Sequence, residues 1–122
     1  MNKPDDGQRR TSRMARELRE IVARFLLHGF RQPLKGFVTV SEVIVTRDLR
    51  SAKVYVSTLG GQDEGEENVD TLNDFAFEIQ KHVASNLDTK FCPKLKFYDD
   101  ENSKRVLRVQ QILKGMEKPT DE

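Results

Sequence analysis

The sequence predicts a two-layer α+β domain, in which two long amphipathic helices cover one face of a three-stranded sheet. Apolar residues recur at helical spacing in two segments, and they alternate with polar residues in the segments between and after them. The order of these elements is α-β-β-α-β, and a short C-terminal helix follows. A length of 122 residues, 36% of them hydrophobic, suits a single domain with a small core.

The N-terminal part begins with polar and charged residues, so residues 1–10 are predicted to form a flexible basic arm. Thr11 or Ser12 is expected to cap a helix over residues 12–28 by accepting a hydrogen bond from a free backbone amide. Gly29 suits the position just after the helix. The apolar stripe of this helix consists of Met14, Leu18, Ile21, Val22, Phe25 and Leu26.

Two strands follow, and the short turn between them predicts an antiparallel hairpin. Residues 37–46 are rich in Val, Ile and Thr, and a break in their alternation predicts a β-bulge near Ser41 and Glu42. Residues 52–57 alternate cleanly between apolar and polar, which indicates a strand with one buried face. The polar turn spans residues 47–50.

The second half begins with residues 60–68, which are acidic, contain glycine and are expected to form an exposed, mobile loop. A second helix over residues 69–88 follows from its apolar stripe. Leu95 and Phe97, flanked by polar residues, predict a third short strand.

A short helix over residues 104–114 completes the predicted domain, which spans residues 11–114. Residues 115–122 are polar and are expected to be a disordered tail.

Composition excludes several classes of protein. No apolar run approaches the roughly 18 residues that a membrane span needs, and the N-terminus lacks the apolar core of a secretion signal. The single cysteine, Cys92, excludes an intramolecular disulfide and a cysteine-based zinc site. We therefore expect a soluble, cytoplasmic protein without a membrane partner.

The net charge of +1 hides segments of opposite charge. Residues 1–60 hold 12 basic and 6 acidic side chains, and residues 79–122 hold 9 basic and 7 acidic ones. Residues 61–78 hold 7 acidic side chains and no basic one. Because salt screens charges beyond about 10 Å, the field at each surface depends on local charge. Near-neutrality therefore does not exclude a nucleic-acid partner.

Few residues suit catalysis or metal binding. His28 and His82 are far apart near helix ends, and neither is spaced for a metal site. Cys92 lies before a proline in an apolar context, which is more typical of a small buried side chain than of a nucleophile. The run of acidic residues at 99–101 is not spaced like a calcium loop. We expect no catalytic residue, no metal and no cofactor.

The basic residues are more informative. Five arginines fall within eleven residues at the start of the first helix, and arginine binds phosphate oxygens bidentately. An ordinary solvated helix face is the alternative. Tyr55 lies on the polar side of its strand and suits either stacking on a base or packing across strands. The three basic groups are Arg9, Arg10, Arg13, Arg16 and Arg19; Lys81, Lys90, Lys94 and Lys96; and Lys104, Arg105 and Arg108.

Several sequence motifs resemble the ribosome-binding factor A family. The central runs are VTVSEV at 38–43, TRDL at 46–49 and AKVYVS at 52–57, and PKLKFYD follows at 93–99. The arginines before the first helix and the Pro-Leu-x-Gly turn at 33–36 match as well. The similarity spans residues 9–114.

This resemblance implies a type II KH-like domain without the GXXG loop that clamps RNA in other KH domains, and this chain has no such loop. Family members carry an Ala-x-Gly kink in the second helical segment. The aligned residues here are Phe75, Ala76 and Phe77, so we expect a weaker or displaced kink. Asn86 and the pair at 84–85 are the alternative sites.

The resemblance also implies a function. It predicts a non-catalytic assembly factor that binds free small (30S) ribosomal subunits, assists their late maturation and supports processing of the 16S rRNA. The expected contact with the rRNA is near its decoding-centre end. The family is associated with growth in the cold. We also expect the free protein to be a monomer. Arg47, Asp48, Lys53 and Tyr55 match the family motif. The expected RNA- and ribosome-binding residues are Arg9, Arg10, Arg13, Arg16, Arg47, Asp48, Lys53, Tyr55, Lys81, Lys90, Lys94, Arg105 and Arg108.

Two alternatives remain open at this stage. One is a protein-interaction module that uses the acidic segment 61–78 to engage a basic partner. The other, a generic single-strand RNA binder, is disfavoured because the chain has no Trp and only two Tyr, and most Phe residues suit core positions.

Overall fold

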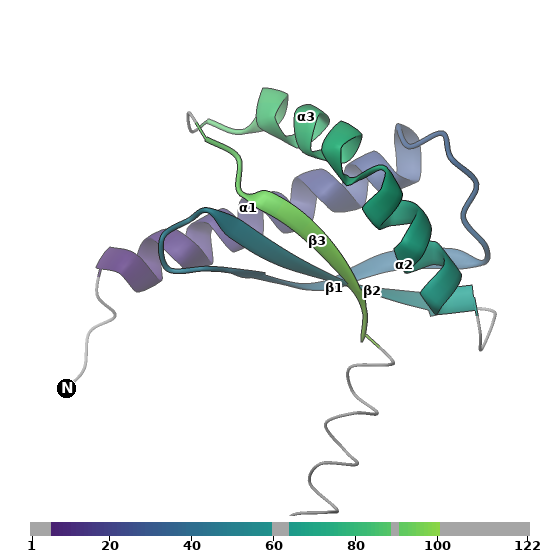
Figure 1. Cartoon of the computed structure of the whole chain (residues 1–122). Coiled ribbons are helices and arrows are strands. Elements are labelled where there is room, and N and C mark those ends of the chain that lie inside the picture. Colours follow the sequence, from purple (N-terminus) through teal and green to yellow (C-terminus); the bar gives the residue numbers. More distant parts are fainter. Residues whose placement is uncertain (1–5, 60–63, 89–90, 101–122) are drawn as a thin grey trace, which may run out of the picture.

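A computed structural model of the chain describes residues 6–59, 64–88 and 91–100, and Figure 1 shows the arrangement of the elements. The predicted helix at 104–114 and the predicted tail lie outside these residues. The elements are α1 (Asp6–His28), β1 (Phe37–Val45), β2 (Ser51–Leu59), α2 (Glu64–Asp74), α3 (Ala76–Asn86) and β3 (Lys94–Asp99).

The sheet has the strand order β1-β2-β3. β1 and β2 form the predicted antiparallel hairpin, and their register shifts between Val40 and Glu42, which confirms the bulge. β3 runs parallel to β2 and, as the last strand in the order, forms one edge of the sheet. A parallel neighbour requires a crossover connection, and α2 and α3 provide it.

The core lies on one face of the sheet. Alternate residues of the strands are buried there, and all three helices pack on this side (Figure 1). This arrangement confirms the predicted two-layer α+β fold. The buried apolar residues are Met14, Leu18, Val22, Val38, Val40, Val43, Val45, Ala52, Val54, Val56, Leu72, Ile79, Val83, Leu95 and Phe97.

Helix α1 begins at Asp6, six residues earlier than the sequence predicts. The expected cap at Thr11 or Ser12 is wrong, because both residues lie inside the helix, where the Thr11 hydroxyl donates to the Gln8 carbonyl at 3.0 Å. Gln and Arg are good helix formers, so the polar residues ahead of the apolar stripe extend the helix. The helix ends at His28, as predicted.

Helix α2 begins within the segment expected to be a loop. Its first residue is Glu64, so the expectation of an exposed loop is wrong for residues 64–68. Gly65 is buried against Asp99, where a Cβ atom would collide with the carboxylate, and Asn68 is only 2% exposed. Three glutamates in the first turn suit the positive end of the helix dipole.

The predicted helix over 69–88 is two helices, and the break between them lies at Phe75. The expectation of a displaced kink is wrong, because α3 continues through 84–85 to Asn86. Phe75 has φ −107° and ψ 18°, a bridge conformation with negative φ that does not require glycine. Its ring packs edge-on against Phe30 at a centroid distance of 6.1 Å. Phe77, the position of the expected glycine, lies in the first turn of α3, so packing at Phe75 fixes the break without a glycine.

The free edge of β3 is covered by side-chain amides. Asn73 of α2 donates from Nδ2 to the Phe97 carbonyl at 3.0 Å, and its Oδ1 accepts from the Phe97 amide at 2.8 Å. Gln80 of α3 accepts from the Leu95 amide at 3.4 Å. These contacts satisfy backbone groups that an exposed edge strand would leave open.

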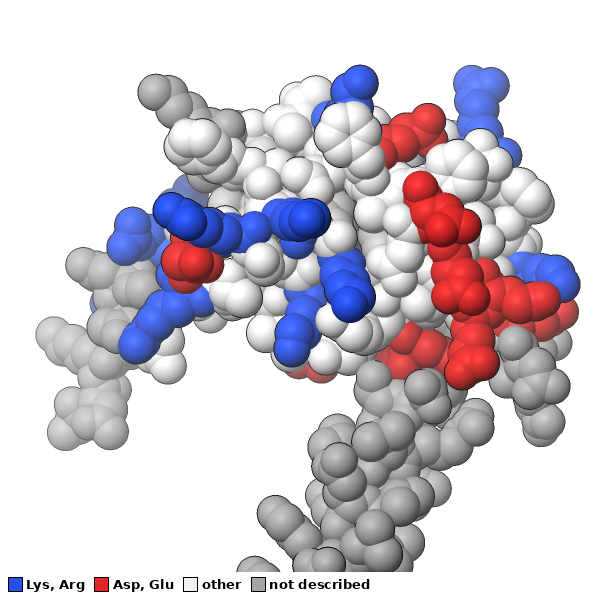
Figure 2. Space-filling view, in the orientation of Figure 1, with Lys and Arg blue, Asp and Glu red and all other residues white. Residues whose placement is uncertain are grey.

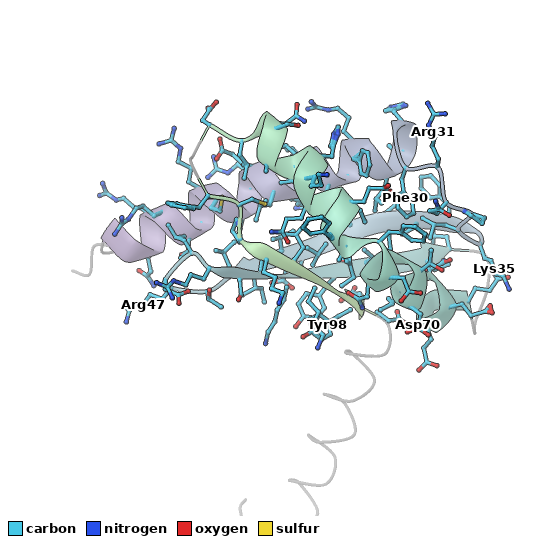
Figure 3. All side chains as sticks on the ribbon, turned by 45° about the horizontal axis from the view of Figure 1, so that its top comes forward. Phe30, Arg31, Lys35, Arg47, Asp70 and Tyr98 are labelled. Carbon is cyan, nitrogen blue, oxygen red and sulfur yellow. The ribbon has the colours of Figure 1, made fainter. Side chains whose placement is uncertain are left out.

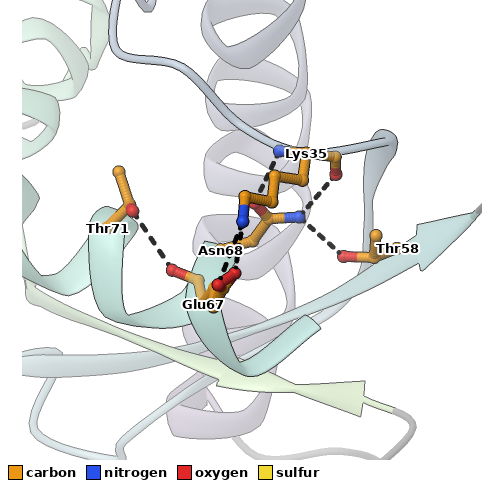
Figure 4. Close-up of polar contacts among 5 residues, drawn as sticks. All are labelled: Lys35, Thr58, Glu67, Asn68 and Thr71. Carbon is orange, nitrogen blue, oxygen red and sulfur yellow. Dashed lines mark hydrogen bonds and ion pairs between the residues drawn. The ribbon is translucent and has the colours of Figure 1, made fainter. Parts of the chain in front are cut away.

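Asn68 connects α2 to the loop before β1 and to the end of β2 (Figure 4). Its Oδ1 accepts from the Lys35 amide at 2.8 Å, and its Nδ2 donates to the Lys35 carbonyl at 2.8 Å and to Thr58 Oγ1 at 3.1 Å. Gly36, which follows Lys35 in the chain, has φ +67°, and a Cβ there would meet the Leu59 carbonyl. Lys35 Nζ also pairs with Glu67 at 2.6 Å, which raises the lysine pKa.

Replacing Asn68 with alanine is expected to destabilise the protein by about 2 kcal/mol, because it leaves a part-buried amide and carbonyl of Lys35 without their partners. Urea unfolding measures the change. The matched control is Asn86→Ala, since Asn86 is exposed and bonds only within α3, and its effect should stay below about 0.5 kcal/mol. Equal effects of the two substitutions would contradict this role of Asn68.

Candidate nucleic-acid interface

The predicted arginines of α1 lie on the surface of its first half. All four are exposed, and none makes an ion pair with another residue in the described ranges. Arg13 and Arg10 line an open cavity of about 270 Å³ together with Leu49 of the hairpin turn and Asp88 beyond α3. The start of α1 therefore lies beside the β1–β2 turn. The four arginines are Arg9, Arg10, Arg13 and Arg16.

Asp48 shapes the β1–β2 turn. Its Oδ1 accepts from the Thr46 hydroxyl at 2.7 Å and from the Arg50 amide at 3.1 Å. These hydrogen bonds hold the pKa of the Asp48 carboxyl below its ordinary value, and the bond from Thr46 has the largest effect. Leu49 adopts φ 62°, which is unusual for a residue with a Cβ, and its amide donates to the Thr46 carbonyl at 2.9 Å. The turn thus holds Arg47 at its tip (Figure 3).

We call the basic end the surface formed by the exposed arginines of the α1 start and the hairpin turn. It brings together two segments that are more than thirty residues apart in the sequence. Charge alone indicated the arginines of the α1 start, and the family motif indicated the hairpin turn. Glu17 and Asp88 also border the cavity there, so the end is basic in excess but not uniformly so. Its members are Arg9, Arg10, Arg13, Arg16, Arg47 and Arg50.

A second group of predicted residues lies on the sheet face opposite the helices, which we call the open sheet face. Lys53 and Tyr55 of β2 and Lys94 of β3 point outward, as the alternating burial of both strands requires. The parallel register adds two residues that sequence reasoning did not place in the site: Lys96 beside Lys53, and Tyr98 beside Tyr55. Strand alternation puts Lys96 and Tyr98 on one face, but only the register shows their neighbours.

The basic end and the open sheet face are continuous. β3 begins at the hairpin turn, where the Lys94 amide donates to the Arg50 carbonyl at 2.8 Å. Figure 2 shows Lys and Arg around the hairpin and over β3, whereas Asp and Glu gather over α2. Helix α2 contains five carboxylates and no basic residue. The charged segments of the sequence therefore become opposite ends of one surface.

Of the remaining predicted residues, Lys81 is described by the structure and does not join this surface. Lys81 lies on α3, where its ammonium is 5.6 Å from the centroid of the exposed Phe77 ring. Lys90, Arg105 and Arg108 lie outside the described residues.

The histidines are closer than the sequence suggests. His28 and His82 line the same open cavity of about 250 Å³, so the expectation that they lie far apart is wrong. The His82 ring stacks on Phe25 at a centroid distance of 4.1 Å, because α1 and α3 pack side by side. Among the described residues, no three His, Cys, Asp or Glu side chains come together as metal ligands do.

Cys92 is half-buried, and this burial raises the pKa of its thiol to about 11. Its Sγ donates to the Pro93 carbonyl at 3.3 Å. The thiol is therefore protonated near neutral pH, which fits a packing role.

At pH 8, the Cys92 thiol is expected to react with DTNB about tenfold more slowly in native protein than in urea-unfolded protein. The thiolate is the reactive form, and the raised pKa lowers its fraction in the folded state. Absorbance of the released thionitrobenzoate measures the rate, and the single cysteine makes the signal site-specific. Equal rates would contradict the raised pKa.

Comparison with known proteins identifies the class of this fold. The solution NMR structure of a Thermotoga maritima protein described as a ribosome-binding factor A superposes with a TM-score of 0.68 at 33% identity, covering 82% of this chain and 92% of that one. The crystal structure of ribosome-binding factor A from Thermus thermophilus gives a TM-score of 0.62 at 18% identity, covering 73% and 94%, and shows the shared fold. The domain is thus of the KH-like α+β class.

The sequence comparisons name the family. The model of the family "Ribosome-binding factor A" matches residues 10–113. The chain is 45% identical to ribosome-binding factor A of Bdellovibrio bacteriovorus, covering 96% of this chain and 87% of that protein. It is 35% identical to that of Thermodesulfovibrio yellowstonii, covering 93% and 96%. The chain belongs to the ribosome-binding factor A family.

A membrane-crossing helix is not found in the part of the chain that the structure describes, where every helix is too short or too polar to span a bilayer.

Proposed function

We propose that this protein is a non-catalytic assembly factor that binds free small ribosomal subunits through their 16S rRNA. It acts late in subunit maturation, supports processing of the 16S rRNA and contacts the RNA near its decoding-centre end. It works in the cytoplasm and is a monomer when free. The sequence family supports the ribosomal partner, and the basic end supports contact with RNA.

A protein of the same fold supports the proposed partner. A homology model of ribosome-binding factor A from Thermus thermophilus has been fitted into a cryo-EM map of its complex with the 30S subunit. That model superposes on this chain with a TM-score of 0.58 at 19% identity, covering 69% of this chain and 88% of that one, so the likeness is one of fold.

The single observation that carries the proposal is the charge separation between the basic end and α2. Arginine forks at the basic end suit phosphate oxygens, and phosphate contacts supply most of the affinity for folded RNA. The carboxylates of α2, among them Asp70, lie at the other end (Figure 3) and repel phosphate. RNA binding at one end and repulsion at the other favour one docking orientation.

The roles within the basic end follow from the geometry. Arg10, Arg13 and Arg47 are proposed to contact phosphates. Asp48, whose Oδ1 is bonded within the turn, is proposed to hold the shape that presents Arg47. Recognition by phosphate contacts and shape suits structured rRNA, whose bases are paired. Binding would hold an immature RNA conformation, and maturation would release the protein.

The variant Arg13→Glu/Arg47→Glu is expected to weaken binding to free small subunits by about tenfold or more and to reduce the slope of log K against log salt by about 1–2. The physical reason is the loss of two phosphate contacts. Gradient co-sedimentation at several salt concentrations measures both, and the wild type should sediment with free small subunits rather than with intact ribosomes.

The matched control is Arg24→Glu/Arg31→Glu, which changes the net charge by the same amount on the second half of α1 and just beyond it. It should weaken binding much less. A folded Arg13→Glu/Arg47→Glu protein with unchanged affinity and slope would refute the basic end as the interface. Glu66→Ser/Asp70→Ser tests the alternative that the acidic segment 61–78 binds a basic protein partner. That alternative requires the variant to lose the protein partner and to retain RNA binding.

A further inference from the structure

The open sheet face contains both tyrosines of the chain, stacked on each other. Tyr55 and Tyr98 are register partners of the parallel strands β2 and β3, with ring centroids 5.4 Å apart and an interplanar angle of 27°. The Lys96 ammonium lies 5.5 Å from the Tyr98 centroid. The two half-buried rings form a continuous aromatic surface about two rings wide, and a lysine borders it.

Lysines surround this pair. Lys53 is the register partner of Lys96, and Lys94 follows one step towards the hairpin turn on the same face. All three side chains are exposed. Among the described residues, the carboxylates nearby are Glu42, the register partner of Tyr55, and Asp100, which is buried and accepts from the Ser57 hydroxyl at 3.3 Å. Positive charge therefore exceeds negative charge on the half of the face next to the basic end.

No described element covers this face. The helices lie on the other side of the sheet, and Figure 3 shows Tyr98 on the side away from them. Ile44, which is 45% exposed, lies beside Lys53 and adds an apolar contact. An aromatic pair, an exposed aliphatic side chain and three cations together match what an unpaired nucleotide presents: a flat apolar base and an anionic phosphate.

We propose that the open sheet face binds a short unpaired stretch of RNA, with a base stacked on the Tyr55–Tyr98 pair and the flanking phosphates held by Lys53, Lys94 and Lys96. An A-form duplex keeps its bases stacked inside, so it cannot use the aromatic pair. The proposal deepens the proposed function and rests on it for the source of the RNA: the basic end holds folded rRNA, and the sheet beside it takes an unpaired segment.

The aromatic contact is tested with a fluorescein-labelled ten-nucleotide RNA without secondary structure and with a twelve-base-pair RNA duplex, both followed by anisotropy. Tyr98→Leu should weaken binding of the single strand about tenfold and leave duplex binding unchanged. Tyr98→Phe keeps the ring and should bind like the wild type. The matched control is Phe77→Leu, which removes an exposed ring from α3, 74% exposed, and should have no effect.

The charge contact is tested with Lys53→Gln/Lys96→Gln. This variant should lower the salt slope of single-strand binding by about 0.7 for each lysine removed. Arg24→Gln/Arg31→Gln removes the same charge from α1 and the loop after it and should change the slope far less. Both lysines are exposed, so this variant is expected to fold even if Tyr98→Leu does not.

Intrinsic fluorescence gives a second readout. The chain has no Trp, and its two Tyr residues both belong to the proposed site. Adding the unlabelled single strand should quench the tyrosine emission, after correction for absorbance by the RNA, and adding the duplex should not.

The results separate this proposal from the proposed function. Unchanged single-strand binding in folded Tyr98→Leu and in Lys53→Gln/Lys96→Gln would refute the site on the sheet, as would duplex binding that depends on Tyr98. Binding of free subunits by the wild type, and its loss in Arg13→Glu/Arg47→Glu, tests the assembly role without reference to the sheet. A sheet that binds a protein of the subunit would show a Tyr98-dependent loss of subunit binding without any loss for the single strand, and this result would also refute the RNA site.

Discussion

Two asparagine side chains of α2 hold together the elements on which the surface is built. Asn68 bonds the loop before β1 and the end of β2, and Asn73 bonds the backbone of β3 on both of its hydrogen-bonding groups. Because an amide both donates and accepts, each replaces a backbone partner that the fold does not supply. Side chains from the helices thereby hydrogen-bond the free backbone groups of the edge strand β3. The opposite face of the sheet is not covered by the described helices. Parallel pairing of β3 with β2 then brings Tyr98 beside Tyr55 and Lys96 beside Lys53.

The same packing explains why the crossover is broken. α2 must follow β3 closely enough for Asn73 to reach Phe97, whereas α3 must pack against α1, where His82 stacks on Phe25. One straight helix cannot satisfy both directions. Phe75 takes the bridge conformation at the junction, and its contact with Phe30 stabilises the break. The negative φ of Phe75 is open to any residue, and Phe77, the position of the expected glycine, lies in the first turn of α3, so the break forms without a glycine.

Much of the fold follows from local pattern. The periodicity of α1, the clean alternation of β2 and the bulge in β1 are all visible in the sequence, because each depends on neighbours within a few residues. The start of α2 is different. Residues 64–68 contain no apolar side chain, so the pattern predicts a loop, yet Gly65 and Asn68 are buried because contacts with Asp99 and with residues of the loop before β1 hold them there. The two histidines show the same limit, since only the packing of α3 on α1 brings them to one cavity.

The sequence by itself determined the fold class, the family, the position of most strands and the separation of charge into basic and acidic segments. Only the tertiary structure decided where those charges lie. It joined the start of α1 to the hairpin turn, moved the acidic segment into a helix at the other end, and placed the two tyrosines in one stack. The physical reason is that charge and aromatic character are properties of single residues, whereas a surface depends on strand register and helix packing between residues far apart in the chain.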